Sequence, residues 1–368
     1  MRILQLVQSL ARGGAERILV DLAAAMPSRG HECLVAILRD EGGFGEEEYP
    51  GIGVRVLLPD GELRWPGYVP RAARALSRLL REWRPDLLLA HTPNVAAVAA
   101  FAGGKVPGIQ VIHWHWGPFS GDGLVRLRRR ALARWTFRRL GRRGIVVSPS
   151  QMEDSAPFLG CPESRLRCVA NGVDPDRFRF VPRESSRDPA IAVVGSLSPV
   201  KRPELAVRAF EVLARSLLRS RLVFAGDGPL RSSLERMCGE SKFGGAVAFA
   251  GNRADVAGIL EECDLLWHPS RNEGFGLAVA EAMASGLPVV AADVVGIREL
   301  VVPGETGALV PFEDSSVVAK ISAEILSDPA RYRRMARAAR NRIEGRFRVD
   351  QMVEGYLDAA RDAVLGRW

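Results

Sequence analysis

Short apolar runs alternate along this chain with longer segments of helical periodicity. An apolar run at 3–7 is followed by a glycine-containing loop at 9–14, a helical segment at 15–26 and a second apolar run at 32–38. Strands separated by helices in this way form parallel sheets that are covered on both faces. The chain is therefore predicted to begin with a strand, a helix and a second, parallel strand.

The same alternation is interrupted once and then resumes. In the first half, further strands are expected at 53–58, 86–90, 110–112 and 144–147. In the second half, strands are expected at 190–194, 221–225, 246–250, 264–268 and 288–291. We predict an α/β protein of two tandem Rossmann-like, doubly wound domains, in which ligands bind at the carboxyl ends of the strands.

The predicted domain limits follow from a polar segment with two prolines at 181–189, which is typical of a linker. It separates a first domain at 1–180 from a second domain at 190–349. The last segment, 350–368, begins with helical periodicity.

Composition agrees with a folded, two-domain chain. The 368 residues are 47% hydrophobic and 26% charged, which excludes a disordered, collagen-like or coiled-coil protein. The 51 Lys and Arg exceed the 43 Asp and Glu, which gives a formal net charge of +8. This charge favours a polyanionic partner, which can be nucleic acid, an anionic membrane or a phosphorylated small molecule. Five scattered cysteines predict neither a disulfide framework nor a zinc site and favour a reducing, cytoplasmic compartment.

No apolar stretch reaches the roughly 18 residues that a membrane-spanning helix needs. The first ten residues carry one arginine and a short apolar run without a cleavage site, so they are interpreted as a buried strand and not as a signal peptide.

The most informative chemistry lies at 268–290, where a strand ends, a glycine-rich turn follows and a helix begins near Gly276. Free N–H groups at a helix start favour a phosphate. Glu273 lies in the turn and Glu281 lies eight residues further on, about 12 Å along a helix, whereas glycoside hydrolases hold their carboxyl groups roughly 5–9.5 Å apart. The spacing suits two carboxylates that hold different ends of a nucleotide sugar, although a surface helix with incidental glutamates explains it equally well.

Six motifs in this order resemble the retaining glycosyltransferases of family 4, which have the GT-B fold, and the resemblance covers essentially the whole chain. The motifs are GGAER at 13–17, NGVD at 171–174 with Phe178 after it, GSLSPVK at 195–201, GDGP at 226–229, the Glu-x7-Glu stretch at 269–290 and GETG at 304–307. The resemblance implies two Rossmann-like domains that face a cleft, and a last helix at 350–368 that crosses back to the first domain.

The resemblance also implies roles for the donor site. Glu281 would bind the ribose hydroxyls and Glu273 a hydroxyl of the donor sugar, while Lys201 would hold the diphosphate and stabilise the leaving-group charge. The sugar and diphosphate would lie on the backbone of four residues, Gly274, Phe275, Gly276 and Leu277.

One position departs from the family pattern, because Ser196 stands where an arginine is common. Arg202, Arg271 and Arg253 are candidates for the missing charge. In the first loop, Gly13 and Gly14 suit the close approach of a phosphate or sugar, since neither has a Cβ. A tight strand-to-helix turn would explain them as well.

Three of the five histidines, His91, His113 and His115, lie close together in the sequence of the first domain. The family often has a histidine near the reacting carbon of the donor, and the alignment of Gly117 favours His115 over His113 for this place. His91 also follows a strand, and with His113 it is assigned to the acceptor side; a structural cap is an equal explanation for His91.

Positive charge is concentrated at 124–143, which contains nine arginines and no acidic residue. The apolar positions of this segment are expected near one helical stripe, as in an amphipathic helix on an anionic membrane; they are Leu124, Leu127, Ala131, Trp135, Phe137 and Leu140. An ordinary solvated helix is the alternative, and a nucleic-acid groove is disfavoured because stacking platforms are absent.

Together these observations predict a retaining glycosyltransferase that moves a sugar from a UDP- or GDP-sugar to an acceptor hydroxyl, with His115, Glu273 and Lys201 as the catalytic residues. The expected acceptor is a lipid-linked or cell-envelope glycan at the cytoplasmic face of a membrane. The resemblance implies no cofactor and no catalytic metal, which also argues against a metal site at the DPD sequence of 174–176. A GT-B sugar-nucleotide epimerase, or a non-catalytic protein that binds membrane or nucleic acid, is the alternative.

Overall fold

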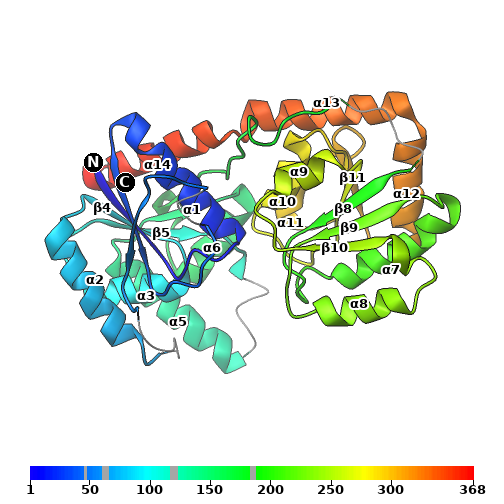
Figure 1. The fold of residues 1–368 in the computed structure, drawn as a ribbon. Helices are drawn as coiled ribbons and strands as arrows, with labels where there is room; N and C mark the ends of the chain where they lie inside the picture. The colour runs from blue at the N-terminus through cyan, green and yellow to red at the C-terminus, as the bar shows by residue number, and fades with distance from the viewer. Residues whose placement is uncertain (45–47, 60–65, 117–122, 183–187) are drawn as a thin grey trace. The chain divides into compact units, whose positions relative to one another are not determined.

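The computed structural model describes residues 1–44, 48–59, 66–116, 123–182 and 188–368. The chain divides into two compact units (Figure 1). The first unit comprises Met1–Asn171 together with Val349–Trp368, and the second comprises Gly172–Arg348. Each unit is built around one parallel sheet.

The first unit has a seven-stranded parallel sheet in the order β3-β2-β1-β4-β5-β6-β7. Its strands are β1 (Arg2–Val7), β2 (Glu32–Ile37), β3 (Gly53–Val56), β4 (Leu87–Ala90), β5 (Gly108–Ile112), β6 (Gly144–Val146) and β7 (Leu166–Cys168). Its helices are α1 (Gly14–Ala25), α2 (Val69–Trp83), α3 (Pro93–Ala102), α5 (Gly123–Arg139), α6 (Pro149–Leu159) and α14 (Val349–Val364).

The second unit has a six-stranded parallel sheet in the order β10-β9-β8-β11-β12-β13. Its strands are β8 (Ala190–Val194), β9 (Arg221–Ala225), β10 (Val247–Gly251), β11 (Leu265–His268), β12 (Val289–Ala292) and β13 (Gly307–Val310). Its helices are α7 (Pro203–Ser216), α8 (Arg231–Gly239), α9 (Val256–Glu261), α10 (Leu277–Ala284), α11 (Val295–Arg298), α12 (Ser315–Ser327) and α13 (Pro329–Arg346).

These strand orders are those of a doubly wound sheet, so the predicted pair of Rossmann-like domains is confirmed. The order reverses between β1 and β4 in the first unit and between β8 and β11 in the second. Loops that leave neighbouring strands in opposite directions create a crevice at this point, at the carboxyl ends of the strands. Each unit therefore has one position in its sheet where a ligand site is expected.

Local sequence explains why the elements form where they do. In α2 the buried residues Ala72, Leu76 and Leu79 recur at three- and four-residue spacing and leave the arginines of the helix outside. Asp314 and Asp328 begin α12 and α13, and each carboxylate accepts hydrogen bonds from two N–H groups of the first turn. Such caps satisfy backbone donors that a helix leaves without partners.

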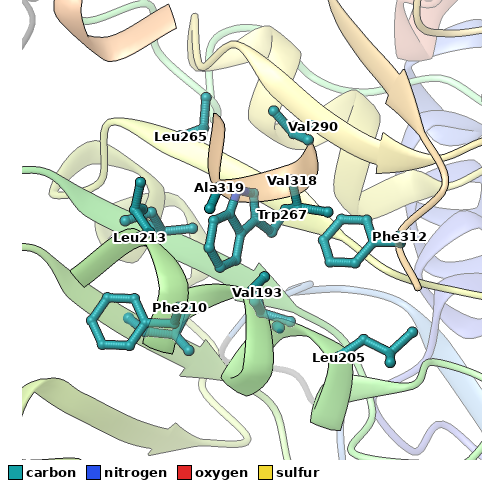
Figure 2. Close-up of a cluster of buried hydrophobic side chains, with 14 of the residues drawn as sticks. Val193, Leu205, Phe210, Leu213, Leu265, Trp267, Val290, Phe312, Val318 and Ala319 are labelled. Atoms are coloured by element: carbon teal, nitrogen blue, oxygen red, sulfur yellow. The ribbon is translucent and has the colours of Figure 1, made fainter. Parts of the chain in front are cut away.

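The core of the second unit shows how the sheet is covered on one face. Trp267 of β11 is fully buried, and its indole N–H donates to Ser322 Oγ of α12 at 2.9 Å. Figure 2 shows Trp267 among side chains of α7 and α12, near Phe312. Because side chains alternate along a strand, His268, the next residue, points away from this core face.

The boundary between the units differs from the predicted one. The first unit ends at Asn171, and Val173 already pairs with Arg348 in the second unit. The predicted limit at 180 therefore lies too late, because the turn after residue 171 is hydrogen-bonded to the end of α13 through Val173 N–H and Phe347 O at 2.8 Å. Of the predicted linker 181–189, residues 183–187 lie outside the described residues.

The predicted strands agree with the observed ones within about two residues at each end. Two strands, β7 and β13, were not predicted. Both are short edge strands, with three and four residues, and neither is a continuous run of large apolar side chains. The pattern of the sequence has too little signal at this length.

Helix α5 contradicts the expectation of one apolar stripe. Phe137 is buried and packs with Ala133 in one core cluster, and Leu140, just after the helix, is buried in another, whereas Leu124 and Trp135 are exposed. Ala133 and Phe137, four residues apart, define the buried face of the helix, and the exposed apolar residues lie outside it. The helix therefore has a core-facing end and a separate, exposed apolar surface.

Candidate active site

Two loops of the second unit leave its sheet at the position where the strand order reverses. The loop at 195–202 follows β8, and the turn at 269–276 follows β11. These strands are direct neighbours, with Ile191 opposite Leu265. Parallel neighbours end at the same edge, so the sheet places the two loops side by side.

Hydrogen bonds join the two loops. Arg271 N–H donates to Val200 O at 2.8 Å, and Arg202 Nε donates to Pro269 O at 2.9 Å. Arg202 has a left-handed backbone conformation with φ +49°, and its guanidinium also pairs with Glu313. Strained backbone of this kind persists where the surroundings enforce it, and it is enriched at functional sites.

Three titratable side chains meet between these loops. Glu273 Oε1 accepts a hydrogen bond from the Lys201 ammonium and lies 2.8 Å from His268 Nε2. The Glu273 side chain is only 11% exposed. Burial by itself would raise its pKa, but the charge of Lys201 and the contact with His268 outweigh burial and hold the pKa of Glu273 far below its usual range. The carboxylate is therefore ionised in a nearly dry setting.

Close packing behind the turn fixes the position of Glu273. A Cβ on Gly296, in α11, would lie 2.3 Å from the carbonyl oxygen of Glu273. Gly276 has φ +90°, and a Cβ there would lie 2.3 Å from Ile297 Cδ1. The Phe275 side chain is buried and packs edge-to-face against Phe347. The side chain of Phe275 is therefore turned into the protein, and only its backbone can face a ligand.

Helix α10 begins directly after the turn. Gly276 is its N-cap and supplies no side chain, so no side chain caps the helix start. Leu277 is the first helical residue, and Gly274 is buried within the turn. Glu281 lies about one turn after Leu277 and is buried, with 8% of its surface exposed. A helix start of this kind attracts an anion through its N–H groups and its dipole.

The candidates for the missing positive charge lie in different places. Arg202 is held by Pro269 and Glu313, and Ser196 contacts Ser198 through their hydroxyl groups at 3.0 Å. Arg253 lines another cavity, of about 410 Å³, between α9 and the sheet. Lys201 is the basic side chain that the structure brings to Glu273.

In the first unit, the loop after β1 leads into α1. Gly13 is the N-cap of that helix, and a Cβ there would lie 2.4 Å from Glu16 Oε2. Gly14 has no heavy atom within 4 Å of such a Cβ. Burial raises the pKa of Glu16, whose side chain folds back over the helix start. The space beside Gly13 is therefore occupied by the Glu16 side chain, whereas the space beside Gly14 is open to a ligand.

The structure brings His91 and His113 together. His91 follows β4 and His113 follows β5; their rings stack with centroids 5.4 Å apart, and His91 Nδ1 lies 3.1 Å from His113 Nε2. Burial lowers the pKa of His91, with a further contribution from His113, and burial lowers the pKa of His113 to about 4. His91 Nε2 and His113 Nδ1 are buried without a hydrogen-bond partner. The pair is therefore uncharged at neutral pH and has unused hydrogen-bonding capacity.

His115 is separate from this pair. Its Nδ1 lies 3.7 Å from Asp154 Oδ2, and the same carboxylate oxygen accepts a hydrogen bond from Trp116 N–H. His115 Nε2 is buried and has no hydrogen-bond partner. His113 and His115 thus contact different groups; both follow the end of β5 at Ile112, so strand alternation does not set their directions.

Two other kinds of feature, a metal site and a membrane-spanning helix, are absent from the described residues. Within the described ranges, no group of three or more His, Cys, Asp or Glu side chains is arranged to hold a metal ion. At the DPD sequence, Asp174 Oδ1 accepts a hydrogen bond from Asp176 N–H in a tight turn. Among all the residues that the structure describes, no helix is long and apolar enough to cross a membrane.

Two family profiles account for most of the sequence. Residues 12–177 match the profile described as Glycosyltransferase Family 4, and residues 174–342 match the one described as Glycosyl transferases group 1. The two matches together run from residue 12 to residue 342. The chain belongs to the family 4 glycosyltransferases. It is a nucleotide-sugar glycosyltransferase of a retaining family.

Individual relatives of this glycosyltransferase differ in their acceptors. It is 29% identical to the glycogen synthase of Mycobacterium tuberculosis over 91% of this chain and 87% of that protein. It is 30% identical to the D-inositol 3-phosphate glycosyltransferase of Rhodococcus opacus over 62% of this chain and 56% of that protein. Family membership therefore leaves the acceptor open.

Solved structures support the GT-B fold of the glycosyltransferase. Anabaena HepE in complex with UDP-glucose is 24% identical and superposes with a TM-score of 0.83, covering 98% of this chain and all of that one. Sucrose-phosphate synthase of Thermosynechococcus elongatus is 20% identical and superposes with a TM-score of 0.83 over 99% of both chains.

The sequence did not identify His268 as part of the glycosyltransferase's site. The residue ends a buried strand five positions before Glu273. A polar residue in the last position of an otherwise apolar, buried strand was the available signal, because such a position opens onto the ligand edge of the sheet.

Proposed function

We propose that this glycosyltransferase binds the diphosphate and sugar of its donor at Lys201, Glu273 and the start of α10, and transfers the sugar to an acceptor hydroxyl with retention. The observation that carries the proposal is the buried, ionised Glu273 in contact with Lys201, beside a helix start that no side chain caps. An anion-binding helix start next to an ammonium and a carboxylate suits a ligand that joins a diphosphate to hydroxyl groups.

In the proposed reaction, each group acts on one part of the donor. The Lys201 ammonium and the N–H groups of α10 stabilise the negative charge that grows on the departing diphosphate. Glu273 accepts hydrogen bonds from sugar hydroxyls, and Glu281 accepts them from the ribose. The departing phosphate takes the proton of the acceptor hydroxyl as that oxygen bonds to the anomeric carbon on the same face. His115, from the first unit, positions the sugar and is not a nucleophile.

A UDP-sugar is the proposed donor, because solved structures of HepE contain UDP or UDP-glucose. A panel of UDP- and GDP-sugars, scored by release of the nucleotide diphosphate, tests this. We expect one donor to be hydrolysed slowly without an acceptor, and Glu281→Ala to weaken its binding. An isomerised nucleotide sugar in place of a free diphosphate would instead identify an epimerase, and full activity of Lys201→Ala and Glu281→Ala together would refute the proposed site.

For the acceptor side we propose a lipid-linked or cell-envelope glycan at the cytoplasmic face of an anionic membrane. The supporting observation is the exposed apolar surface on α5. Leu124 and Leu127 are more than 60% exposed, and Trp135 packs against the exposed Phe101 with ring centroids 4.7 Å apart. Arginines surround these residues, and each basic residue near an anionic surface contributes about 1 kcal/mol.

Flotation with vesicles that contain an anionic lipid tests the membrane proposal. The variant Arg126/Arg128/Arg129→Ala leaves Arg130 and Arg134 in place, because these donate to the Pro157 carbonyl and hold α6. We expect it to lose most vesicle binding, while a control with three exposed arginines of α2 replaced, Arg74/Arg78/Arg81→Ala, retains it. Equal binding by both variants would contradict a specific role for α5.

A further inference from the structure

We propose that His268 is a positioning residue that holds the Glu273 carboxylate toward the donor sugar when Lys201 moves to the diphosphate. This inference rests on the proposed function, in which Lys201 and Glu273 hold different parts of one donor. It adds a residue to the site and gives each of the two partners of Glu273 a separate task.

The first step of the argument is that one oxygen of Glu273 serves both partners. Lys201 Nζ and His268 Nε2 both contact Glu273 Oε1. If the ammonium turns to a bound diphosphate, its contact with this oxygen weakens or is lost. His268 then remains as the side chain that contacts the carboxylate in the described part of the site.

The second step is that the two partners differ in their freedom to move. The Lys201 side chain is 29% exposed and ends a flexible four-carbon stem, whereas the His268 side chain is 4% exposed. His268 is the last residue of β11, and the preceding Trp267 is anchored on the opposite face by its hydrogen bond to Ser322. The imidazole is therefore fixed by the sheet, and the ammonium can exchange partners.

The third step concerns the charge of Glu273. Burial favours the protonated carboxyl, and the low pKa depends on both Lys201 and His268. When Lys201 neutralises the diphosphate, an N–H of His268 continues to donate to the carboxylate and keeps it ionised. An ionised carboxylate accepts hydrogen bonds from two sugar hydroxyls, while a protonated one uses part of its capacity as a donor. His268 thereby preserves the acceptor that the sugar requires.

The test compares binding of UDP and UDP-glucose by calorimetry in wild type, His268→Leu and His268→Gln. Leucine removes the hydrogen-bond donor to Glu273 and is apolar. The glutamine amide restores an N–H group that can reach Glu273. We expect His268→Leu to bind UDP as wild type does and UDP-glucose about 10- to 100-fold more weakly, as for loss of a hydrogen bond to a charged group. His268→Gln should recover most of this loss.

The outcomes separate this inference from the proposed function. If wild type binds neither UDP nor UDP-glucose, and no other sugar nucleotide of the panel, the proposed function fails and the inference with it. If wild type binds UDP-glucose and His268→Leu binds it equally well, only the inference is overturned. If His268→Leu loses UDP and UDP-glucose to the same extent, or glutamine gives no rescue, His268 supports the fold of the turn and the inference is wrong. Replacement of a half-buried histidine of the first unit, His31→Gln, is the matched control and should change neither affinity.

Discussion

The two units place histidines at the same position of equivalent sheets and use them differently. In the second unit, His268 at the end of β11 contacts a carboxylate that an ammonium also contacts, so opposite charges meet in a nearly dry site. In the first unit, His91 and His113 contact one another after β4 and β5, with buried nitrogen atoms that have no partner. The pKa of each of these two histidines is below its usual range, so both rings are neutral at neutral pH.

The two arrangements suit different ligands. A compensated charge cluster can exchange one charged partner for another, which suits a diphosphate. A neutral histidine pair offers one donor or acceptor on each ring, which suits an uncharged hydroxyl group. The comparison therefore supports the proposals that the donor binds to the second unit and that His91 and His113 act on the acceptor side.

The largest expected effect comes from breaking the charged cluster. Lys201→Ala should lower the transfer rate about 100- to 1000-fold, as loss of one group that stabilises developing negative charge does. The maximal rate should fall more than the affinity for the acceptor. Lys320→Ala, which removes an exposed lysine from α12 of the same unit, should leave both unchanged. Steady-state kinetics with saturating donor provides the measurement, and a rate within twofold of wild type would contradict the role of Lys201.

A smaller effect is expected from crowding the turn that carries Glu273. Gly276→Ala places a Cβ 2.3 Å from Ile297 and forces alanine into φ +90°, whereas Gly304→Ala meets a similar φ, +81°, in open space. We expect the second change to cost about 1–2 kcal/mol in the free energy of unfolding, and the first to cost about 1–3 kcal/mol more. Denaturant unfolding of both variants measures the difference, and equal losses would show that the packing against α11 is unimportant.

The smallest effect concerns the neutral histidine pair. His91 and His113 have folded pKa values below the unfolded value of about 6.5, so the unfolded chain binds more protons as the pH falls below that value. Stability should therefore decrease from about pH 6.5 toward the folded pKa of His113, about 4. In His113→Leu, the slope of the free energy of unfolding in this window should become less steep by about one proton. An unchanged slope would mean that the pair is already protonated in the folded protein.

Regular elements and site contacts were not equally predictable from the sequence. The apolar run of β8 and the glycine-rich turn before α10 carry their structure in consecutive residues, so both were found. The cluster around Glu273 depends on Lys201, which lies 72 residues away, and a sequence pattern does not record that distance in space. The family resemblance supplied Lys201, but it assigned no role to His268.

Two other residues show the same limit. Arg202 was a candidate for the missing diphosphate charge, yet its guanidinium is held by Pro269 and Glu313, contacts that only the folded loop creates. His91 and His113 were assigned to the acceptor side separately. That they form a pair follows from the adjacency of β4 and β5, which the strand order of a doubly wound sheet could have provided.

Direct titration of UDP-glucose into wild type and Lys201→Ala/Glu281→Ala tests the central claim, that the donor is held at the carboxyl ends of β8 and β11. The account predicts a loss of affinity of about 100-fold or more, because each replaced residue makes a hydrogen bond in which one partner is charged. Unchanged affinity in the double variant, with its fold verified by the same thermal unfolding as wild type, would contradict the assignment of the donor site to the second unit.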